Sequence, residues 1–288
     1  MRLPTRLLRR KADSSKGDYG HIFILAGCAR YAGAAVLCAE AIMRSGAGLV
    51  TLGIPKSINS AIIKIKPKEV MTLPLPETAS GSLSAKAFKK IKDFARKIDL
   101  LVIGPGLGRD KSTQSLARKV ARNINKPTVI DADGLNALAG HLDLLAKTYN
   151  LTPETIILTP HPGEMSRLLG ISVNKIQNNR REIANKFVKD YPVTLVLKGH
   201  NTIVAEYKDK IYVNKTGNPG MSSAGSGDVL SGMIAAFLGQ GLDAFNAAKY
   251  GVYLHGLAGD LAAKEKTQIS LIASDIIAKI PEAIKKSS

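Results

Sequence analysis

The fold of this chain is decided by the stretch His21-Ile22-Phe23-Ile24-Leu25-Ala26-Gly27-Cys28-Ala29-Arg30-Tyr31-Ala32-Gly33-Ala34-Ala35. It opens with a short apolar run and continues through a loop bounded by Gly27 and Gly33 into an alanine-rich segment. A strand that leads through a tight glycine loop into a helix is the first half of a β-α-β unit. We therefore expect an α/β protein, with the first long helix starting near Ala34.

The same alternation of short apolar runs and amphipathic segments continues along the chain. It predicts strands at His21–Ala26, Leu49–Gly53, Val70–Leu73, Leu100–Gly104, Thr128–Asp131 and Ile156–Thr159, with helices following most of them. Strands that are joined through helices form a parallel sheet. We expect a mostly parallel central sheet with helices on both faces.

Further along the chain the pattern changes, because only turns separate three apolar runs at Val193–Leu197, Thr202–Glu206 and Lys210–Val213. This spacing predicts an antiparallel meander at the edge of the sheet. After Gly225 the chain reads as helix nearly to its end. The sequence contains no internal repeat and no low-complexity linker, so we expect residues 1–288 to form one domain.

The composition, with 45% hydrophobic and 22% charged residues, is that of a globular protein with a core. A formal charge of +18 raises nucleic acid, anionic lipid or a phosphorylated substrate as binding partners. Only 5% of the residues are aromatic and Trp is absent, so we expect no nucleic-acid partner. Arg44 interrupts the longest apolar pattern before it reaches the ~18–20 residues of a membrane span, and we expect no membrane partner.

Two cysteines, Cys28 and Cys38, lie in a predicted loop and helix. Their spacing fits neither a disulfide framework nor a zinc site, so we interpret them as reduced thiols. The arginines near the N-terminus are followed by no apolar segment and no long amphipathic one, as a secretory or transit peptide would require. We therefore expect a cytoplasmic protein.

Two glycine-containing loops follow predicted strands. Gly27–Gly33 precedes a helix, where free backbone N–H groups and the helix dipole favour phosphate. Gly104-Pro105-Gly106-Leu107-Gly108 lies at the carboxyl edge of the sheet, where open α/β sheets place their ligands. The first loop matches neither the Walker nor the dinucleotide fingerprint, so a plain turn stays open as an alternative for both loops.

Acidic residues follow two other predicted strands. Asp131 could orient a ligand or a metal-bound water, whereas we interpret Asp133 as the N-cap of a helical turn over Leu135–Leu138. In His161-Pro162-Gly163-Glu164, two prolines flank the histidine and hold it near the carboxylate, which favours a functional site. The alternative is that Glu164 complements a helix dipole.

The strongest local signal is Asn218-Pro219-Gly220-Met221-Ser222-Ser223-Ala224-Gly225-Ser226-Gly227-Asp228, which leads into an apolar helix over Val229–Leu238. Gly225, Ser226 and Gly227 leave consecutive N–H groups open to an anion whose charge grows in a transition state. We expect a β-branched residue at Gly227 to crowd that anion and to be unable to adopt the backbone angles of glycine. Asp228 would repel the anion unless it accepts a proton from an attacking hydroxyl; complementing the helix dipole is the alternative.

Together these segments resemble the ADP/ATP-dependent NAD(P)H-hydrate dehydratases, a family of the ribokinase-like superfamily. The resemblance spans nearly the whole chain in the family's order and rests on Lys16-Gly17-Asp18-Tyr19-Gly20, Gly33-Ala34-Ala35, Gly104–Gly108, His161–Glu164, Lys198-Gly199 with Thr202, and Asn218–Asp228. It implies a ribokinase-like fold. Some members carry an additional epimerase domain, and with 20 residues before the first predicted strand we expect the stand-alone form.

The resemblance also implies an activity, the dehydration of the S epimer of hydrated NADH or NADPH, a metabolite repair in which ADP is converted to AMP and phosphate. Hydroxide is a poor leaving group, so the family phosphorylates the hydroxyl and lets phosphate depart as the ring double bond re-forms. Asp228 is the implied catalytic base and also contacts the substrate. The other implied substrate contacts are Ala34 or Ala35, Gly106 and His161. The implied nucleotide-binding residues are Lys198, Gly199, His200, Asn201, Thr202, Gly225, Ser226 and Gly227.

Mg²⁺ is the implied cofactor, with Glu164 as the carboxylate that positions it through water. We choose ADP over ATP because the sequence shows no targeting segment and bacterial and archaeal members typically use ADP. The resemblance implies a homo-oligomer, such as a tetramer, and a separate NAD(P)H-hydrate epimerase as functional partner. Two alternatives stay open: a ribokinase-like kinase for a vitamin or hydroxymethylpyrimidine, and a basic nucleic-acid-binding protein.

Overall fold

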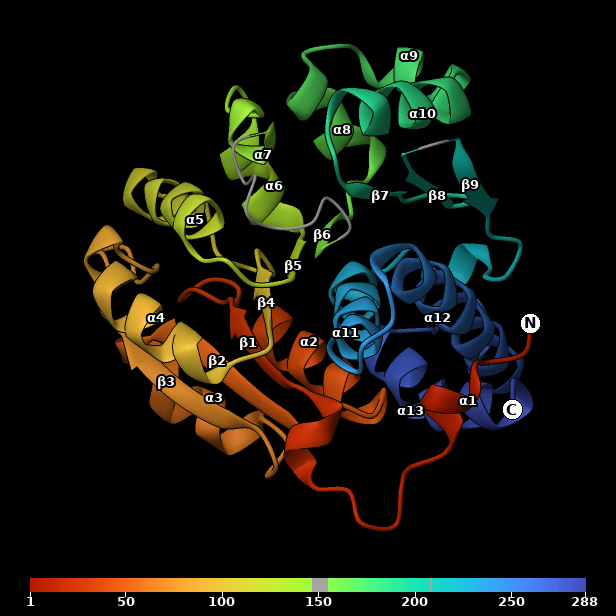
Figure 1. Ribbon diagram of the computed structural model, residues 1–288, viewed down its shortest axis with the longest axis horizontal. Coiled ribbons are helices and arrows are strands. Elements are labelled where there is room, and N and C mark those ends of the chain that lie inside the picture. Colours follow the sequence, from red (N-terminus) through yellow and green to blue (C-terminus); the bar gives the residue numbers. More distant parts are fainter. Residues whose placement is uncertain (147–154, 208) are drawn as a thin grey trace.

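Figure 1 shows the computed structural model of the chain, which describes residues 1–146, 155–207 and 209–288. One sheet of nine strands, in the order β3-β2-β1-β4-β5-β6-β7-β8-β9, runs through the molecule. The strands are β1 His21–Leu25, β2 Leu49–Pro55, β3 Met71–Leu75, β4 Leu100–Ile103, β5 Thr128–Ile130, β6 Ile156–Leu158, β7 Thr194–Leu197, β8 Ile203–Glu206 and β9 Lys210–Val213. That residues 1–288 form one domain stays a prediction.

The sheet is parallel from β3 to β7 and antiparallel from β7 to β9. This confirms the predicted α/β class, the parallel core and the antiparallel meander at its edge. The predicted strand ends differ from the observed ones by one or two residues.

Helices cover both faces of the sheet, as predicted, and the described part of the chain forms α1 Thr5–Leu8, α2 Ala32–Arg44, α3 Asn59–Ile65, α4 Phe88–Phe94, α5 Lys111–Asn123, α6 Ala132–Leu138, α7 Asp143–Ala146, α8 Pro162–Leu169, α9 Val173–Asn178, α10 Arg180–Asp190, α11 Ser226–Gly239, α12 Ala244–Lys266 and α13 Ala273–Lys286. Alternation along β1 assigns the faces: Ile22 and Ile24 pack with α2, α11, α12 and α13, while Phe23 and Leu25 pack with α4 and α5. None of the helices in the described ranges combines the length and the apolar character that crossing a membrane demands.

The helices α2 and α11 lie against each other beneath the sheet (Figure 1). Their close approach depends on small residues, because a Cβ added to Gly232 of α11 would lie 2.5 Å from the carbonyl oxygen of Cys38 in α2. The start of α2 was predicted near Ala34, but the helix begins at Ala32 with Tyr31 as N-cap. This packing places the N-terminus of α11 beside the loop that follows β1.

We expect Gly232→Ala to lower the thermal stability of the protein, by about 1–3 kcal/mol, because the added methyl group would push α2 and α11 apart. Gly33→Ala is the matched control, since a Cβ added at Gly33 meets no atom within 4 Å. Alanine is the better helix former, so the control should unfold at the wild-type temperature or above it. Equal melting curves for Gly232→Ala and the wild type would contradict this account of the packing.

Candidate active site

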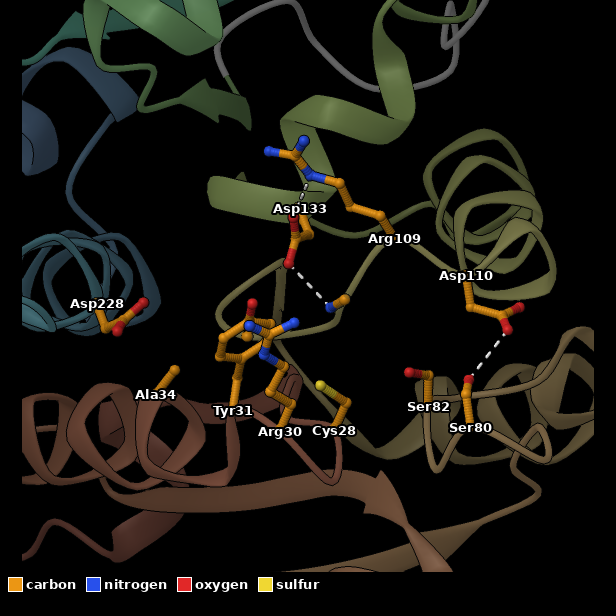
Figure 2. A pocket seen from close by; sticks show the side chains of 12 residues that line it. Cys28, Arg30, Tyr31, Ala34, Ser80, Ser82, Arg109, Asp110, Asp133 and Asp228 are labelled. Carbon is orange, nitrogen blue, oxygen red and sulfur yellow. Dashed lines mark hydrogen bonds and ion pairs between the residues drawn. The ribbon is translucent and has the colours of Figure 1, made fainter.

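The loops that follow the parallel strands meet at one edge of the sheet, together with the N-terminus of α11. Parallel strands end at a common edge, and open α/β sheets bind their ligands there. A cavity of about 690 Å³ opens at this edge. Its lining residues are Cys28, Arg30, Tyr31, Ala34, Ser80, Ser82, Gly106, Gly108, Arg109, Asp110, Asp133 and Asp228. In Figure 2, Asp228 lies on the opposite side of the cavity from Asp110, with Tyr31 and Arg30 between them.

Three of the predicted substrate contacts, Ala34, Gly106 and Asp228, line this cavity. Gly106 has φ +62° and packs so closely on the β1–α2 loop that an added Cβ would lie 2.5 Å from the carbonyl oxygen of Tyr31. Only glycine fits this turn, and the turn carries Gly106 to Ala34 at the start of α2. Ala35, the other candidate at this position, is 0% exposed, so Ala34 is the alanine that faces the cavity.

The N-terminus of α11 has the open geometry that the glycines predict. Gly225 is its N-cap, with φ +88°, and because glycine has no side chain, the N-cap residue does not occupy the first N–H groups of the helix. A Cβ at Gly225 would lie 2.5 Å from Leu37 Cδ1. The backbone of Gly227 does not lie in the left-handed region, so the expectation that Gly227 needs the special angles of glycine is wrong. That requirement belongs to Gly225, which turns the chain into the helix.

Ser226, the first residue of α11, is buried, and its hydroxyl lies 3.3 Å from Nε2 of His255 in α12. Burial lowers the pKa of His255 to about 4, so this histidine is neutral at physiological pH. The serine side chain is thereby held by a neutral partner. His255 was not predicted from the sequence, because no motif surrounds it and its partner Ser226 is 29 residues away.

Asp228 combines access to the cavity with an unusual acidity. Burial and the nearby carboxylates of Asp131, Glu164 and Asp133 raise its pKa from 3.8 to about 7, although the ammonium group of Lys198 acts in the opposite direction. A carboxylate with a pKa near neutrality can accept a proton from a hydroxyl far better than an ordinary one can.

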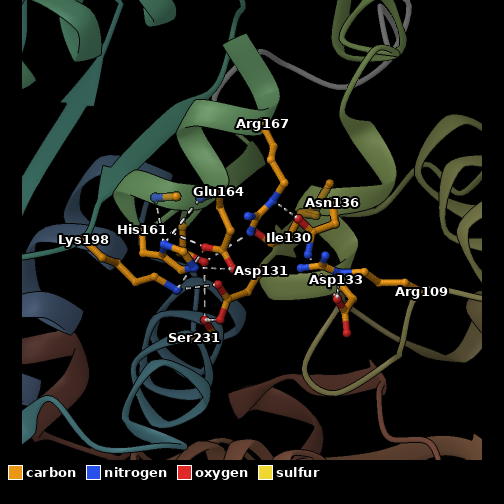
Figure 3. Close-up of polar contacts among 12 residues, drawn as sticks. Arg109, Ile130, Asp131, Asp133, Asn136, His161, Glu164, Arg167, Lys198 and Ser231 are labelled. Atoms are coloured by element: carbon orange, nitrogen blue, oxygen red, sulfur yellow. Dashed lines mark hydrogen bonds and ion pairs between the residues drawn. The ribbon is translucent and has the colours of Figure 1, made fainter. Parts of the chain in front are cut away.

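A cluster of charged side chains ties the ends of β5 and β7 and the start of α8 to α11 (Figure 3). Lys198, directly after β7, donates to Oδ1 of Asp131 over 2.7 Å and lies 3.8 Å from Oε2 of Glu164. Ser231 of α11 donates to Oδ2 of Asp131 over 2.6 Å. Burial acts against the charge on Lys198, but the carboxylates outweigh it, and the pKa of Lys198 lies above its ordinary value.

His161 and Glu164 form a reciprocal cap at the start of α8. Nδ1 of His161 accepts from the backbone N–H of Gly163 over 2.9 Å, and Oε2 of Glu164 accepts from the backbone N–H of His161 over 2.8 Å. Burial and the charge of Lys198 lower the pKa of His161, which favours its neutral form. Burial raises the pKa of Glu164. His161 is half-exposed and is not part of the cavity lining, so its contact with substrate stays a prediction.

Glu164 was predicted to position Mg²⁺. Both of its oxygens already have protein partners, at 2.8 Å from the backbone nitrogen of His161 and 3.4 Å from its Nε2. Within the described ranges, no three His, Cys, Asp or Glu side chains form a cluster that could hold a metal ion. These residues therefore fit Mg²⁺ only as the resemblance implied. Phosphates of the ligand and water would hold the ion, and Glu164 would contact it through water.

Asp133 has a role that the sequence did not indicate. The predicted N-cap role is wrong, because Asp131 holds the N-cap position of α6 and Asp133 lies within its first turn. The carboxylate of Asp133 accepts from the backbone N–H of Gly108 over 2.9 Å and lies 3.4 Å from Nε of Arg109. It thereby anchors the loop after β4 to α6.

The turn after Lys198, where nucleotide contacts were predicted at Gly199, His200, Asn201 and Thr202, is shaped by Arg180 of α10. Its guanidinium donates to the carbonyl oxygens of Leu197, Lys198 and His200. Arg180 is a functional candidate that sequence reasoning missed, since nothing near it in sequence signals a partner 17 to 20 residues away. Lys198 itself points away from this turn, into the buried cluster (Figure 3).

Comparison with known proteins decides the family. The family model described as NAD(P)H-hydrate dehydratase matches residues 22–282. The chain belongs to the NAD(P)H-hydrate dehydratase family. It is similar to the ADP-dependent (S)-NAD(P)H-hydrate dehydratase of Neisseria meningitidis, with 38% identity over 96% of this chain and 88% of that protein.

Other relatives differ in length and in how much of the chain's similarity they share. The Bifunctional NAD(P)H-hydrate repair enzyme Nnr of Moorella thermoacetica is 43% identical over 98% of the chain and 52% of its own length. The chain thus spans about half the length of the curated relatives it matches first. The ADP/ATP-dependent NAD(P)H-hydrate dehydratase of Bacillus subtilis, co-crystallized with ATP/Mg²⁺, has a TM-score of 0.80 at 30% identity, covering 97% of this chain and 94% of that one. A hydroxyethylthiazole kinase of Pyrococcus horikoshii shares only the ribokinase-like fold, at 13% identity and a TM-score of 0.62.

The two glycines at the start of α11 should respond differently to substitution. A side chain at Gly227 would meet the flexible end of Lys198 at 3.3 Å, so we expect Gly227→Val to fold while crowding the anion-binding N–H groups and abolishing turnover. Gly225→Ala would strain a left-handed backbone and meet Leu37, so we expect a lower melting temperature. Thermal melts and rates for both variants check this, and a normally active Gly227→Val protein would place the anion site elsewhere.

Proposed function

We propose that this chain dehydrates the S epimer of hydrated NADH and NADPH, with ADP as the phosphoryl donor and AMP and phosphate as the other products. The observation that carries the proposal is the position of Asp228, a carboxylate with a pKa of about 7 in the first turn of α11, facing the cavity. It stands directly beside helix N–H groups that suit an anion. Family membership supports the substrate and the donor.

The reaction runs in two stages that together avoid the expulsion of hydroxide. Asp228 accepts the proton of the substrate hydroxyl as its oxygen attacks the terminal phosphorus of ADP and the bond from that phosphorus to the bridging oxygen breaks, releasing AMP. The carbon–oxygen bond then breaks as the ring nitrogen donates its electron pair, and phosphate leaves with the electrons of that bond. The neighbouring ring carbon of the resulting iminium then loses a proton to water, and the ring double bond re-forms. A carboxylate poised near neutrality serves the first stage, since it is ionised in about half of the molecules at pH 7.

The phosphoryl group would lie at the N-terminus of α11, on the N–H groups of Gly225, Ser226 and Gly227. This site offers fixed dipoles that need no rearrangement as charge moves onto the group. Ala34 and Gly106 would contact the hydrated dinucleotide in the cavity, with His161 toward its far side. The turn Gly199–Thr202 would contact the nucleotide. Mg²⁺, when bound with the nucleotide, would neutralise charge on the phosphates, with Glu164 as its outer partner.

A single assay tests this function and separates it from that of a kinase on the same fold. The enzyme is incubated with NADH hydrate, Mg²⁺ and either ADP or ATP, while NADH absorbance and released phosphate are followed. The proposal expects both signals to rise together, faster with ADP. A stable phosphorylated substrate without recovered NADH would identify a kinase. Recovery of NADH in EDTA with no nucleotide would contradict the phosphoryl-transfer route.

Replacement of Asp228 should separate catalysis from stability. Asp228→Asn keeps the shape of the side chain but cannot accept the hydroxyl proton, so we expect turnover to fall roughly 10²–10⁴-fold while ADP still binds. If Asp228 served only the helix dipole, the rate would stay nearly intact. The measurement pairs the rate of NADH recovery with equilibrium binding of ADP.

The acidity of Asp228 also predicts two pH dependences. The groups that face it are Asp131, Asp133, Glu164 and Lys198, and the net effect places its pKa at about 7. The rate should therefore rise with pH up to about 7. Because the folded state binds this proton more tightly than the unfolded chain does, ionisation of Asp228 costs stability as the pH rises from about 4 through 7. At pH 8, Asp228→Asn should melt above the wild type, whereas at pH 4 the two should melt together.

The assembly and the location of the enzyme are also proposals. We infer a homo-oligomer, such as a tetramer, located in the cytoplasm and acting with a separate NAD(P)H-hydrate epimerase. Exposed apolar side chains on α3 and the edge strand β3 support association: Ile63 is 52% exposed, Ile65 60% and Met71 41%. Light scattering of the purified protein measures the assembly, and a monomer at micromolar concentration would contradict it.

A further inference from the structure

Asp131 is buried directly after β5, and apart from its effect on the pKa of Asp228 it has no part in the proposed reaction. Only 1% of the residue is exposed, and both carboxylate oxygens are occupied. Oδ1 accepts from Nζ of Lys198 over 2.7 Å, and Oδ2 accepts from the hydroxyl of Ser231 over 2.6 Å. One carboxylate thus connects the ends of two strands with α11.

The ammonium group of Lys198 lies against the glycine that opens the anion site. A Cβ built on Gly227 would lie 3.3 Å from Nζ of Lys198 and 4.0 Å from Oδ2 of Asp131. The Lys198 side chain is 16% exposed, so its charge is little screened by water. The turn that follows it, residues 199 to 202, is more exposed and separate from this position.

The balance of charge at this point requires a cation. Asp131, Glu164 and Asp228 bring three carboxylates toward the N-terminus of α11, and each of them acts on the pKa of the others or of Lys198. A transferring phosphoryl group would add further negative charge. Lys198 contacts both Asp131 and Glu164, whereas Arg167 acts on Glu164 alone among these three carboxylates.

Asp131 also determines how α11 presents Asp228. Ser231 follows Asp228 by three residues, and side chains at that spacing lie on the same face of a helix. The bond from Ser231 to Asp131 therefore fixes the rotation of the face that carries Asp228. The same carboxylate fixes the ammonium group of Lys198 on that face.

We propose that Lys198 contacts and neutralises the transferring phosphoryl group, and that Asp131 is the positioning residue that holds Lys198 and the α11 face in register for it. This inference rests on the proposed function. In it, Lys198 contacts the phosphoryl group of the donor and not its nucleoside part. Asp131 acts through Lys198 and Ser231 and does not itself touch the substrate.

The test is a cycle of Asp131→Asn, Lys198→Met and the double variant. Each single change leaves a buried charge without its main partner, so we expect both to lower the melting temperature and the turnover. The double variant removes both charges and should regain most of the melting temperature. Its kcat should stay about 10²–10³-fold below the wild type, the loss typical for one preorganised electrostatic contact, while ADP affinity changes little.

Recovery of turnover together with stability in the double variant would overturn the proposal, because the pair would then be purely structural.

Ser231→Ala is a milder change that tests the positioning role in a folded protein. We expect a several-fold lower kcat at an unchanged KM for ADP. An unchanged kcat would show that Asp131 has no positioning role. The exposed ion pair of Lys189 and Asp209, 3.0 Å apart, gives the matched control. Lys189→Met with Asp209→Asn should leave both rate and melting temperature near the wild type.

The outcome is separable from that of the proposed function. If the wild-type enzyme recovers no NADH from the hydrate, the proposed function fails. The four proteins are then compared by their rates of phosphoryl transfer to the acceptor that the enzyme does use. If the wild type is active and the double variant is equally active, only the inference on Asp131 and Lys198 fails.

Discussion

A buried ammonium group, that of Lys198, is the constraint on which the arrangement at the carboxyl edge depends. A buried cation requires carboxylates close by, because its desolvation is otherwise too costly. Asp131 and Glu164 meet that need from the ends of β5 and the start of α8, at 2.7 and 3.8 Å. Each carboxylate is in turn fixed, one by Ser231 of α11 and the other by the backbone of His161. The ends of β5 and β7 and the helices α8 and α11 are thereby held together.

The same charges explain why Asp228 is suited to accept a proton. A carboxyl group in the first turn of a helix would ordinarily be more acidic than in water, since the helix dipole favours its ionised form. Burial and the carboxylates of Asp131, Glu164 and Asp133 reverse that tendency and raise its pKa to about 7. Burial is the largest cause of this rise, and the neighbouring carboxylates add to it. Without Asp131 and Glu164, the pKa of Asp228 would still be raised by burial, but by less, so its proposed role as a base depends on the cluster as well as on burial.

How much the sequence could predict depends on how local the signal is. The strands, the meander and the glycine loops were predictable because their patterns repeat over a few residues. The partners of Asp131 lie 67 and 100 residues away and carry no local signal. Asp133 was misassigned for the same reason: its capping composition is local, whereas its partner Gly108 belongs to another loop. Gly225 and Gly227 look alike in sequence, and only the contact with Leu37 and a positive φ distinguish them.

The overall charge of the chain gives little guidance to its site. The formal charge is +18, yet the acidic residues that line the cavity, Asp110, Asp133 and Asp228, outnumber the basic ones, Arg30 and Arg109. Asp133 also pairs with Arg109, at 3.4 Å. On the proposed function, an anionic nucleotide and an anionic dinucleotide would meet there, and backbone N–H groups, Lys198, the two arginines and a divalent cation would offset their charge. Such a site would select ligands by the position of their phosphoryl groups, because a phosphoryl group beyond the reach of these few groups would lie beside carboxylates instead.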